Sequence, residues 1–288
     1  MLHKIGFIGL GTVGRHMAAN LVKGGYDLTV FDTDKEKIDE LVAIGATGAA
    51  TAAEAARGRE LVISIVSEGD EQGPLFCGET GILAGIEPGT IFADMGTTSL
   101  ETTLKMAEET SKKRCFYLDA PVWGNKDHAA NGLLTIIVGG DPAIIGKCRE
   151  PFSIFGLNTI TVGEVGDATK MKFIVNMVQG TLVQVLAEGL VFGEKMGFSA
   201  DKILEVLDTR GVASPIFHLK GRAMSRNEFA RSLAMKYVND GMHLVLNAAR
   251  LVGLHLPAAE AASKMYEKGV EAGYGEEDFS AVIKVLRK

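Results

Sequence analysis

A glycine-rich loop near the start of the chain limits most strongly what this sequence can fold into. Gly9, Gly11 and Gly14 form GLGTVG directly after the apolar run KIGFI, and a helical pattern, Arg15–Lys23, begins at once. A strand, a tight glycine turn and a helix in this order open a βαβ unit. Up to about residue 160, short apolar runs alternate with helical patterns. The sequence therefore predicts an α/β fold with a doubly wound parallel sheet.

The pattern gives bounds for most elements of this sheet. The expected strands are Lys4–Ile8, Asp27–Phe31, Leu61–Ile65, Ile91–Asp94, Tyr117–Asp119, Leu134–Val138 and Thr159–Val162. The expected helices between them include Gly14–Lys23, Lys35–Ile44, Ser99–Lys113 and Pro142–Phe152. Beyond these, helix follows helix to the end, beginning with a long one from Ala168 to Met196. We expect a Rossmann-type domain at residues 1–163 and an all-α domain at 164–288, entered through the long helix.

The glycine loop also indicates a ligand. Gly9 permits the tight turn, Gly11 lets a pyrophosphate approach the backbone, and Gly14 allows the helix to pack closely on the strand. Asp32 ends the next strand at the distance where an acidic residue binds the hydroxyls of an adenosine ribose. The predicted cofactor loop runs from Gly9 to Gly14 and includes Leu10, Thr12 and Val13.

Acidic residues at the end of this second strand bear on the choice of cofactor. A 2′-phosphate would meet Asp32 and Asp34 with no arginine nearby, and like charges at close range cost several kcal/mol. Lys35 and Lys37 partly offset the two acids. We therefore expect NAD rather than NADP.

Composition excludes several other classes of protein. The formal net charge of -6 is spread along the chain, so we expect small-molecule partners and no nucleic-acid or membrane surface. Three distant cysteines and six histidines match no metal-binding spacing, so no metal is predicted. The N-terminus lacks a convincing cleavage site and no uninterrupted apolar run reaches about 20 residues, which favours a cytoplasmic protein.

A reaction is suggested by the segment from Gly163 to Gly180, GEVGDATKMKFIVNMVQG. Lys172 and Asn176 lie four residues apart in an expected helix, which puts an ammonium and an amide on one face. Such a pair can serve as a proton donor and its orienting partner in carbonyl reduction by a nicotinamide. An ordinary solvated lysine is the alternative.

With these residues in hand, the chain resembles the β-hydroxyacid dehydrogenase family nearly from end to end. The shared segments are GLGTVG with HMAANL, DMGTTS at 94–99, DAPVWGN at 119–125, MKFIVNMV at 171–178 and the terminal GYGEEDFSAVIKVL. The resemblance is nearest to the glyoxylate and succinic-semialdehyde reductase branch. It implies that Lys172 is the catalytic acid and base, that Asn176 orients substrate or lysine, and that Val66, Ser67 and Thr97 line the cofactor groove. It also implies that the second domain serves substrate binding and homo-oligomerisation, as a dimer or a tetramer.

Two departures from the family affect the expected substrate site, which comprises Trp123, Gly124, Asn125, Lys236 and Asp240. Relatives commonly carry serine where this chain has Trp123, followed here by Gly124 and Asn125. Relatives also carry a Lys-Asp pair near the nicotinamide, and ungapped counting places Asp240-Gly241 there. Lys236, one turn earlier, is a candidate for the missing positive charge. The physiological substrate and the preferred reaction direction stay open.

The resemblance thus implies an oxidoreductase that transfers a hydride between NAD(H) and a small hydroxyacid or semialdehyde. An imine reductase on the same scaffold is one alternative, and a non-catalytic NAD-binding protein is another. In both alternatives the relatives lack the lysine, so Lys172 argues against them.

Overall fold

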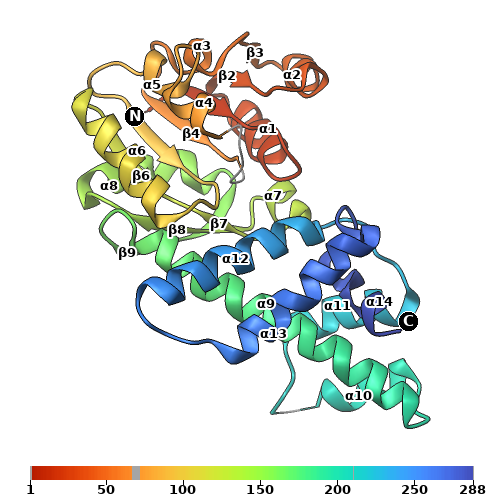
Figure 1. Ribbon diagram of the computed structural model, residues 1–288. Helices are drawn as coiled ribbons and strands as arrows, with labels where there is room; N and C mark the ends of the chain where they lie inside the picture. The colour runs from red at the N-terminus through yellow and green to blue at the C-terminus, as the bar shows by residue number, and fades with distance from the viewer. Residues whose placement is uncertain (1, 67–71, 210, 288) are drawn as a thin grey trace. The chain divides into compact units, whose positions relative to one another are not determined.

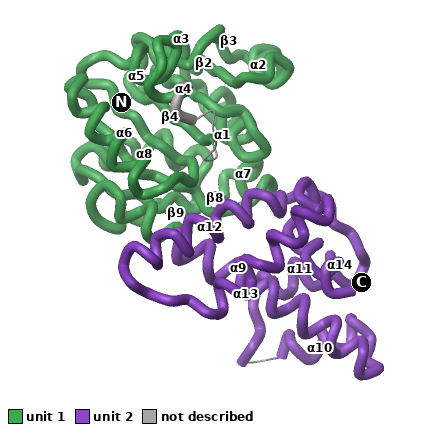
Figure 2. The backbone as a smooth tube through the Cα atoms, viewed as in Figure 1, with its two compact units in different colours: residues 1–172 green, residues 173–288 purple. Residues whose placement is uncertain are grey.

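The computed structural model describes residues 2–66, 72–209 and 211–287, and the chain forms two compact units (Figures 1 and 2). The first unit is Met1–Lys172 and the second is Phe173–Lys288. The division falls inside the long helix α9 (Asp167–Lys195), whereas the sequence suggested a boundary after residue 163. The first turn of α9 belongs to the first unit because Asp119, at the end of a strand, accepts hydrogen bonds from it.

A single twisted sheet forms the centre of the first unit. Its strands are β1 (Lys4–Ile8), β2 (Asp27–Phe31), β3 (Thr47–Gly48), β4 (Leu61–Ser64), β5 (Ile91–Asp94), β6 (Phe116–Asp119), β7 (Val122–Trp123), β8 (Leu134–Gly139) and β9 (Gly156–Gly163). They follow the order β3-β2-β1-β4-β5-β6-β8-β7, with β9 paired to β8. From β3 to β6 every neighbouring pair is parallel, which is the order of a doubly wound nucleotide-binding sheet.

The far edge of the sheet departs from the expected parallel arrangement. Strand β8 runs antiparallel to both β6 and β7, and β9 is parallel to β8, so the sheet is mixed. Only residues 124–133 connect β7 to β8. A parallel pair needs a crossover connection of about a dozen residues or more, so this short segment returns the chain antiparallel.

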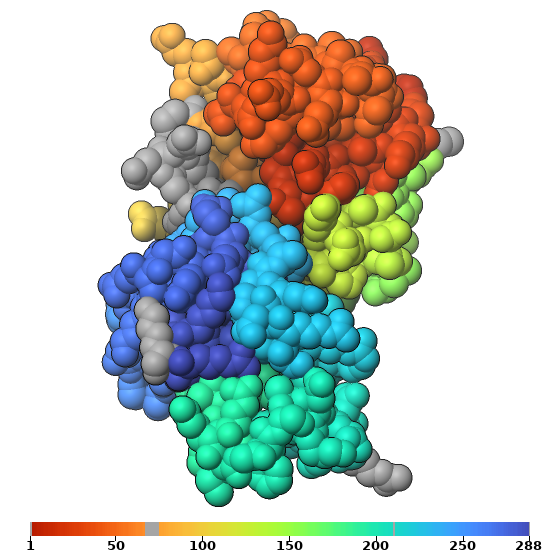
Figure 3. All heavy atoms as spheres, turned by 90° about the vertical axis from the view of Figure 1, so that its right-hand side faces the viewer, coloured from red at the N-terminus to blue at the C-terminus, as the bar shows by residue number. Residues whose placement is uncertain are grey.

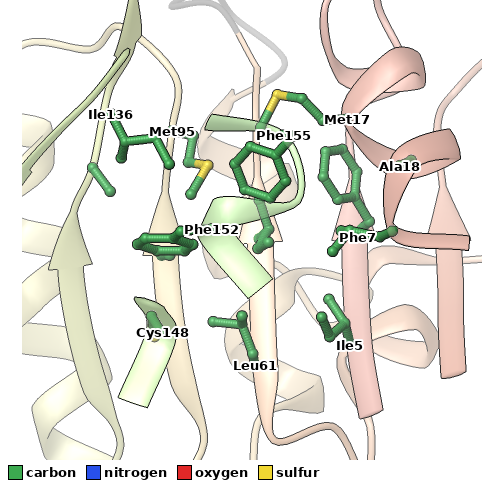
Figure 4. Close-up of a cluster of buried hydrophobic side chains, with 14 of the residues drawn as sticks. Ile5, Phe7, Met17, Ala18, Leu61, Met95, Ile136, Cys148, Phe152 and Phe155 are labelled. Carbon is green, nitrogen blue, oxygen red and sulfur yellow. The ribbon is translucent and has the colours of Figure 1, made fainter. Parts of the chain in front are cut away.

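Helices cover both faces of the sheet, because alternate residues of each strand point to opposite sides. Ile5 and Phe7 of β1 point to one face, which is covered by α1 (Gly14–Lys23), α2 (Lys35–Val42), α7 (Lys126–Ala130) and α8 (Pro142–Ser153). Figure 4 shows this cluster, in which Met17 of α1 and Phe152 of α8 lie over the strands. Ile8 belongs to the cluster on the other face, under α3 (Ala52–Ala56), α4 (Gln72–Cys77), α5 (Ile82–Gly85) and α6 (Leu100–Lys112).

The second unit is helical throughout the part that the structure describes. Its elements are the greater part of α9, α10 (Ala200–Leu207), α11 (Pro215–Arg226), α12 (Met235–Leu251), α13 (Pro257–Gly269), a π-helical turn η1 (Val270–Tyr274), a 3₁₀ turn η2 (Phe279–Val282) and α14 (Ile283–Leu286). Its core contains Leu186 and Leu190 of α9 together with Tyr266 and Phe279. In Figure 3 the dark-blue C-terminal residues lie directly beside the lighter blue preceding helices.

A buried ion pair anchors the end of the second unit. Lys220 Nζ lies 2.8 Å from Asp278 Oδ2, and both side chains are buried. Ser232 and Ser280 donate hydrogen bonds to the same carboxylate. Because each polar group has partners, the pair avoids most of the cost of burying an unpaired charge.

One helix, α9, is long and apolar enough to cross a membrane by length and composition alone. Its residues Val183, Leu186 and Leu190 are fully buried in the core of the second unit. A core helix passes the same test of length and hydropathy. The packing of these side chains accounts for part of the apolar character of α9.

Candidate functional site

The loop between β1 and α1 lies where the strand order reverses. From β1 the chain adds β2 and β3 on one side and then returns to add β4, β5 and β6 on the other. Open α/β sheets bind ligands at the carboxyl ends of the strands beside such a reversal. Gly9 follows β1 and Val66 comes soon after β4, so both stand at this position.

The three glycines of the loop have separate physical roles. Gly9 has a φ of 96°, and a Cβ there would meet the carbonyl oxygen of Ile65 at 2.4 Å. A Cβ on Gly14 would meet the carbonyl oxygen of Gly9 at 2.1 Å. At Gly11 no atom of the described residues, its chain neighbours apart, lies within 4 Å of that position. The protein itself requires Gly9 and Gly14, whereas the open space at Gly11 fits a pyrophosphate approaching the backbone.

The start of α1 is equally suited to a phosphate. Val13 occupies the cap position, and no side chain makes a capping hydrogen bond there. The first N–H groups of a helix otherwise lack intrahelical partners and attract anions. The residues from Gly9 to Val13, Leu10 and Thr12 included, therefore form a loop that fits the diphosphate of a dinucleotide.

Asp32, at the end of β2, is tied to this loop. Its Oδ2 accepts a hydrogen bond of 2.6 Å from the Leu10 N–H, and its Oδ1 accepts one of 2.9 Å from the Asp34 N–H. Lys37 Nζ lies 3.3 Å from Asp32 Oδ1 and 3.4 Å from Asp34 Oδ2. Oδ1 accepts from both Asp34 and Lys37, whereas Oδ2 keeps a second lone pair, so Asp32 retains acceptor capacity for a ribose hydroxyl.

The carboxyl ends of β4 and β5 bring two further expected cofactor residues together. A Cβ on Gly96 would meet the carbonyl oxygen of Val66 at 2.2 Å, so the two backbone segments touch. Thr97 follows Gly96 and is half-buried. Ser67 lies outside the described residues.

Near these strand ends, three buried polar side chains form hydrogen bonds that the sequence did not predict. Ser64 Oγ donates to Asp94 Oδ1 over 2.7 Å, and the Tyr117 hydroxyl donates to Asp94 Oδ2 over 3.3 Å. Burial raises the pKa of Asp94 to about 6. The available signal was Ser64 and Asp94 at the ends of two neighbouring apolar strands and Tyr117 within the next strand, but only the register shows that they meet.

Lys172 is a buried titratable group of the first unit whose pKa is strongly shifted. Its side chain is buried, with 8% of the residue exposed, and Nζ donates a hydrogen bond of 2.8 Å to the carbonyl oxygen of Val122. Burial lowers the pKa of the ammonium to about 8. A group with a pKa near neutrality can both give and take a proton at physiological pH. The exposed Lys170, two residues earlier, is instead ion-paired with Asp167 at 2.9 Å.

The strand end that precedes Val122 also fixes the start of α9. Asp119 Oδ2 accepts hydrogen bonds from the N–H groups of Gly166 (2.9 Å) and Thr169 (2.8 Å). Asp119 Oδ1 accepts one of 2.8 Å from the Thr169 hydroxyl. Burial raises the pKa of Asp119, while these hydrogen bonds favour its charged form. The role of Asp119 and Thr169 was not foreseen from the sequence.

Asn176 lies one helical turn after Lys172 on α9, within the second unit. Its side-chain amide lies close to Gly241 of α12, where an added Cβ would stand 3.1 Å from Asn176 Nδ2. The absence of a side chain at position 241 thus allows the amide to lie against the α12 backbone.

The segment from Trp123 to Asn125 has a defined conformation. Trp123 is 46% exposed and pairs with Thr135 of β8. Gly124 has a φ of 145°, and a Cβ there would meet Leu134 at 2.6 Å. Asn125 Oδ1 accepts hydrogen bonds from the N–H groups of Asp127 and His128, so it caps α7. The side-chain oxygen Oδ1 of Asn125 is therefore engaged in capping α7.

Two expected substrate residues lie on α12 in the second unit. Asp240 is exposed. Lys236 Nζ lies 2.5 Å from Glu276 Oε1, and this hydrogen bond raises the pKa of Lys236. To supply a positive charge to a substrate, Lys236 would have to leave or share this surface ion pair, which solvent screening keeps weak.

Two protein-family models match successive parts of the chain. The model for the NAD binding domain of 6-phosphogluconate dehydrogenase matches residues 4–163. A second model, described as NAD-binding of NADP-dependent 3-hydroxyisobutyrate dehydrogenase, matches residues 166–286. Together the two models cover both the strand-rich part and the helical part of the chain.

Individual relatives match over nearly the whole chain. Glyoxylate/succinic semialdehyde reductase 1 of Arabidopsis thaliana is 33% identical over 284 residues, which are 99% of this chain and 98% of that protein. Cytokine-like nuclear factor N-PAC of Homo sapiens is 32% identical over 98% of this chain and 51% of its own length. The structure of Mycobacterium tuberculosis 3-hydroxyisobutyrate dehydrogenase with L-serine matches with a TM-score of 0.90 and 28% identity, covering 100% of both chains.

Proposed function

The chain belongs to the β-hydroxyacid dehydrogenase family, and we propose that it transfers a hydride between NAD(H) and a small hydroxyacid or semialdehyde, with Lys172 as the proton donor and acceptor. Family membership makes it an NAD(P)-dependent oxidoreductase. The observation that carries the assignment of Lys172 is its buried ammonium, whose pKa is lowered to about 8. Few surface lysines have such a value, because solvation keeps the pKa of an exposed lysine near 10.4.

In the proposed reaction the cofactor carries the hydride, and the protein residues transfer the proton and hold the reactants. A bound nicotinamide cofactor supplies or accepts the hydride. In reduction the Lys172 ammonium protonates the carbonyl oxygen of the substrate, and in oxidation the neutral amine takes the proton back. Asn176, one turn along α9, orients the lysine or the substrate oxygen. The Gly9–Gly14 loop and Asp32 hold the diphosphate and the ribose, and Val66, Ser67 and Thr97 line the groove for the rest of the cofactor.

The preferred cofactor is NAD. A 2′-phosphate placed at Asp32 would face two carboxylates, Asp32 and Asp34, with a single ammonium, that of Lys37, hydrogen-bonded or ion-paired to both. Two acids against one base leave a net negative charge, which repels the phosphate. NADH should therefore bind more tightly than NADPH, and Asp32→Asn should narrow the difference. Equal affinities of the wild-type protein for the two cofactors would contradict this preference.

The substrate differs in size or charge from those of relatives with serine and lysine at the corresponding positions. Trp123 is partly exposed beside Val122, whose carbonyl oxygen accepts the Lys172 hydrogen bond. Asp240 adds a negative charge in the second unit. Trp123→Ser combined with Asp240→Lys should raise turnover of glyoxylate or succinic semialdehyde. Unchanged turnover of both compounds would count against a substrate role for these residues.

We also propose a homo-oligomer, a dimer or a tetramer, in the cytoplasm. Ile174, Val178, Val185 and Phe192 of α9 follow helical spacing in the second unit, and each is 47–69% exposed. An apolar stripe of this length on a soluble protein favours burial against another chain. Light scattering coupled to size-exclusion chromatography gives the assembly, and a monomer at micromolar concentration would contradict the proposal.

The test of the reaction uses Lys172→Ala with Lys170→Ala as a matched control on the same helix. Loss of the acid and base should lower kcat by about 10²- to 10⁴-fold while the dissociation constant for NADH stays unchanged. Lys170→Ala should retain the wild-type kcat, because Lys170 is exposed and paired with Asp167. The assay measures NADH oxidation with a panel of semialdehydes, glyoxylate and cyclic imines. Turnover of imines alone would replace the proposal by an imine reductase, and NADH binding without any turnover would replace it by a non-catalytic binding protein.

A further inference from the structure

Three buried threonine hydroxyls form a continuous hydrogen-bonded chain in the first unit. Thr98 Oγ1 lies 2.9 Å from Thr103 Oγ1, and Thr103 Oγ1 lies 3.0 Å from Thr169 Oγ1. The Thr169 hydroxyl then donates to Asp119 Oδ1 over 2.8 Å. All four side chains are buried. A buried polar chain of this kind is stabilising only when every member has a partner.

The carboxylate of Asp119, at one end of this row of hydroxyls, determines which hydroxyl donates to which. Each threonine hydroxyl has one proton to donate and can accept at its lone pairs. The Thr169 proton is given to Asp119, so Thr169 can only accept from Thr103. When the Thr103 proton points to Thr169, Thr103 in turn accepts from Thr98. The Ser99 carbonyl, 3.2 Å from Thr103 Oγ1, is a longer alternative acceptor for the Thr103 proton. The shorter contacts therefore run in one direction, from Thr98 to Asp119.

The chain joins two parts of the site that lie far apart in the sequence. Thr98 directly follows Thr97, at the carboxyl end of β5, and Thr103 lies on α6. Thr169 lies in the first turns of α9, three residues before Lys172. Asp119 lies three residues before Val122, whose carbonyl oxygen accepts the hydrogen bond from Lys172. Two hydrogen-bonded pairs, Asp119 with Thr169 and Val122 with Lys172, thus fasten the end of β6 and the start of β7 to the same helix.

We propose that Thr169 is a positioning residue that sets Lys172 relative to the cofactor loop at Thr97, through the chain from Thr98 to Asp119. The inference rests on the proposed function for the identity of the proton donor. Without the Thr169 hydroxyl, Thr103 loses its acceptor and Asp119 loses one donor, so the first turns of α9 are less firmly fixed. Lys172 then gains freedom to leave its hydrogen bond with Val122 and reach water.

The kinetic experiment compares Thr169→Val, Thr169→Ser and Thr110→Val. Valine has the shape of threonine without the hydroxyl, and serine restores the hydroxyl. Thr110, on α6, is the control because it is equally buried and its hydroxyl has no hydrogen-bond partner among the described residues. We expect Thr169→Val to lower kcat by about 10- to 100-fold with unchanged NADH affinity, since small misplacements of a reacting group cost this much. Thr169→Ser and Thr110→Val should keep the wild-type kcat.

A second readout does not depend on turnover. The rate at which acetic anhydride modifies Lys172, followed by peptide mass spectrometry against pH, reports the titration of this amine in the apoprotein. In Thr169→Val the titration should move upward from about 8, because a more hydrated ammonium is harder to deprotonate. Thr110→Val should titrate as the wild type. If Thr169→Val does not fold, Thr103→Val interrupts the same chain and leaves the bonds between Asp119 and α9 in place.

The outcomes separate this inference from the proposed function. A wild-type protein without turnover on any compound overturns the proposed function, while the titration of Lys172 still tests the positioning. A Thr169→Val protein that matches Thr110→Val in both kcat and titration overturns the positioning role. A lower melting temperature with unchanged kcat and titration likewise overturns it, since the hydroxyl then serves stability alone.

Discussion

Lys172 donates its hydrogen bond to an uncharged acceptor, the main-chain carbonyl oxygen of Val122, at 2.8 Å. A carboxylate partner would hold the proton on the lysine, whereas a carbonyl offers no net negative charge against the cost of burial. Burial therefore decides the titration and lowers the pKa of Lys172 to about 8. This relationship makes the lysine a usable acid and base at the same time.

The pH dependence of the two reaction directions should be opposite. Reduction needs the ammonium, so kcat/KM for a semialdehyde should be constant at low pH and fall as pH rises above about 8. Oxidation needs the neutral amine, so kcat/KM for the hydroxyacid should rise through the same pH. The pKa of Lys172 appears in both profiles because kcat/KM reports the protein before it binds the varied substrate, with its cofactor in place. Two profiles with the same direction of change would exclude Lys172 as the shared group.

The glycine loop predicts a separation between folding and cofactor binding. Gly14→Ala should destabilise the protein without cofactor, because the added Cβ meets the Gly9 carbonyl oxygen at 2.1 Å. Gly11→Ala should leave the melting temperature of the apoprotein nearly unchanged, since the added Cβ would meet no atom of the described residues within 4 Å, its chain neighbours apart. The same Gly11→Ala change should weaken NADH binding at least about tenfold, corresponding to about 1.4 kcal/mol. NADH affinity equal to that of the wild type would show that the diphosphate lies elsewhere.

Asp94 predicts a stability that depends on pH. Its pKa rises from 3.8 to about 6 in the folded protein because it is buried. The folded state thus holds the proton more strongly than the unfolded state, so this group's contribution to the free energy of unfolding falls as pH rises between these two values. Asp94→Asn removes the titration and keeps the shape. The difference in unfolding free energy between variant and wild type should grow by about 2 kcal/mol between pH ~4 and ~6, and by about 3 kcal/mol over the whole titration.

Urea unfolding of both proteins at several pH values measures this difference. Effects of every other titrating group cancel when the two proteins are compared at one pH. A difference that stays constant across the range would mean that Asp94 keeps its charge in the folded protein.

The contact between Gly241 and Asn176 predicts that a larger residue at position 241 lowers kcat without changing cofactor binding. In Gly241→Ala the added Cβ stands 3.1 Å from Asn176 Nδ2, so the amide must shift by a few tenths of an ångström. We expect kcat to fall about tenfold with unchanged NADH affinity, because orientation of a reacting group is sensitive to small shifts. Gly189→Ala is the control within α9, since no atom lies within 4 Å of its Cβ. That variant should keep kcat and gain about 0.5–1 kcal/mol in stability from its helix propensity. Equal kcat values for the two variants would separate Asn176 from the reaction.

Local patterns predicted the first half of the fold closely. β1, β2 and α1 have the bounds expected from the sequence, because each is an apolar run or helical pattern closed by glycine or acidic residues. The antiparallel β8 was not foreseen, since its apolar run is as typical of a parallel strand as of an antiparallel one. The short elements β7 and α7 were missed for a related reason, namely that a few residues carry no measurable periodicity.

In the candidate site, the sequence likewise predicts relations within one element but not contacts between different elements. Lys172 and Asn176 stand out in the sequence because they share one helix and a spacing of four residues. The partners of Asp119 and Asp94 come from different elements, and only the strand register and the entry of α9 bring them together. Sequence reasoning could name the polar residues at the strand ends, but not which hydroxyl donates to which carboxylate.

The Val122 acceptor has a consequence for engineering. Because the main-chain oxygen holds Lys172, no exchange of side chain at position 122 or 123 can delete the acceptor itself. Position 123 is therefore suited to saturation mutagenesis for new substrates. Libraries can replace Trp123 by any other residue while Lys172 keeps its hydrogen bond to the main-chain oxygen of Val122.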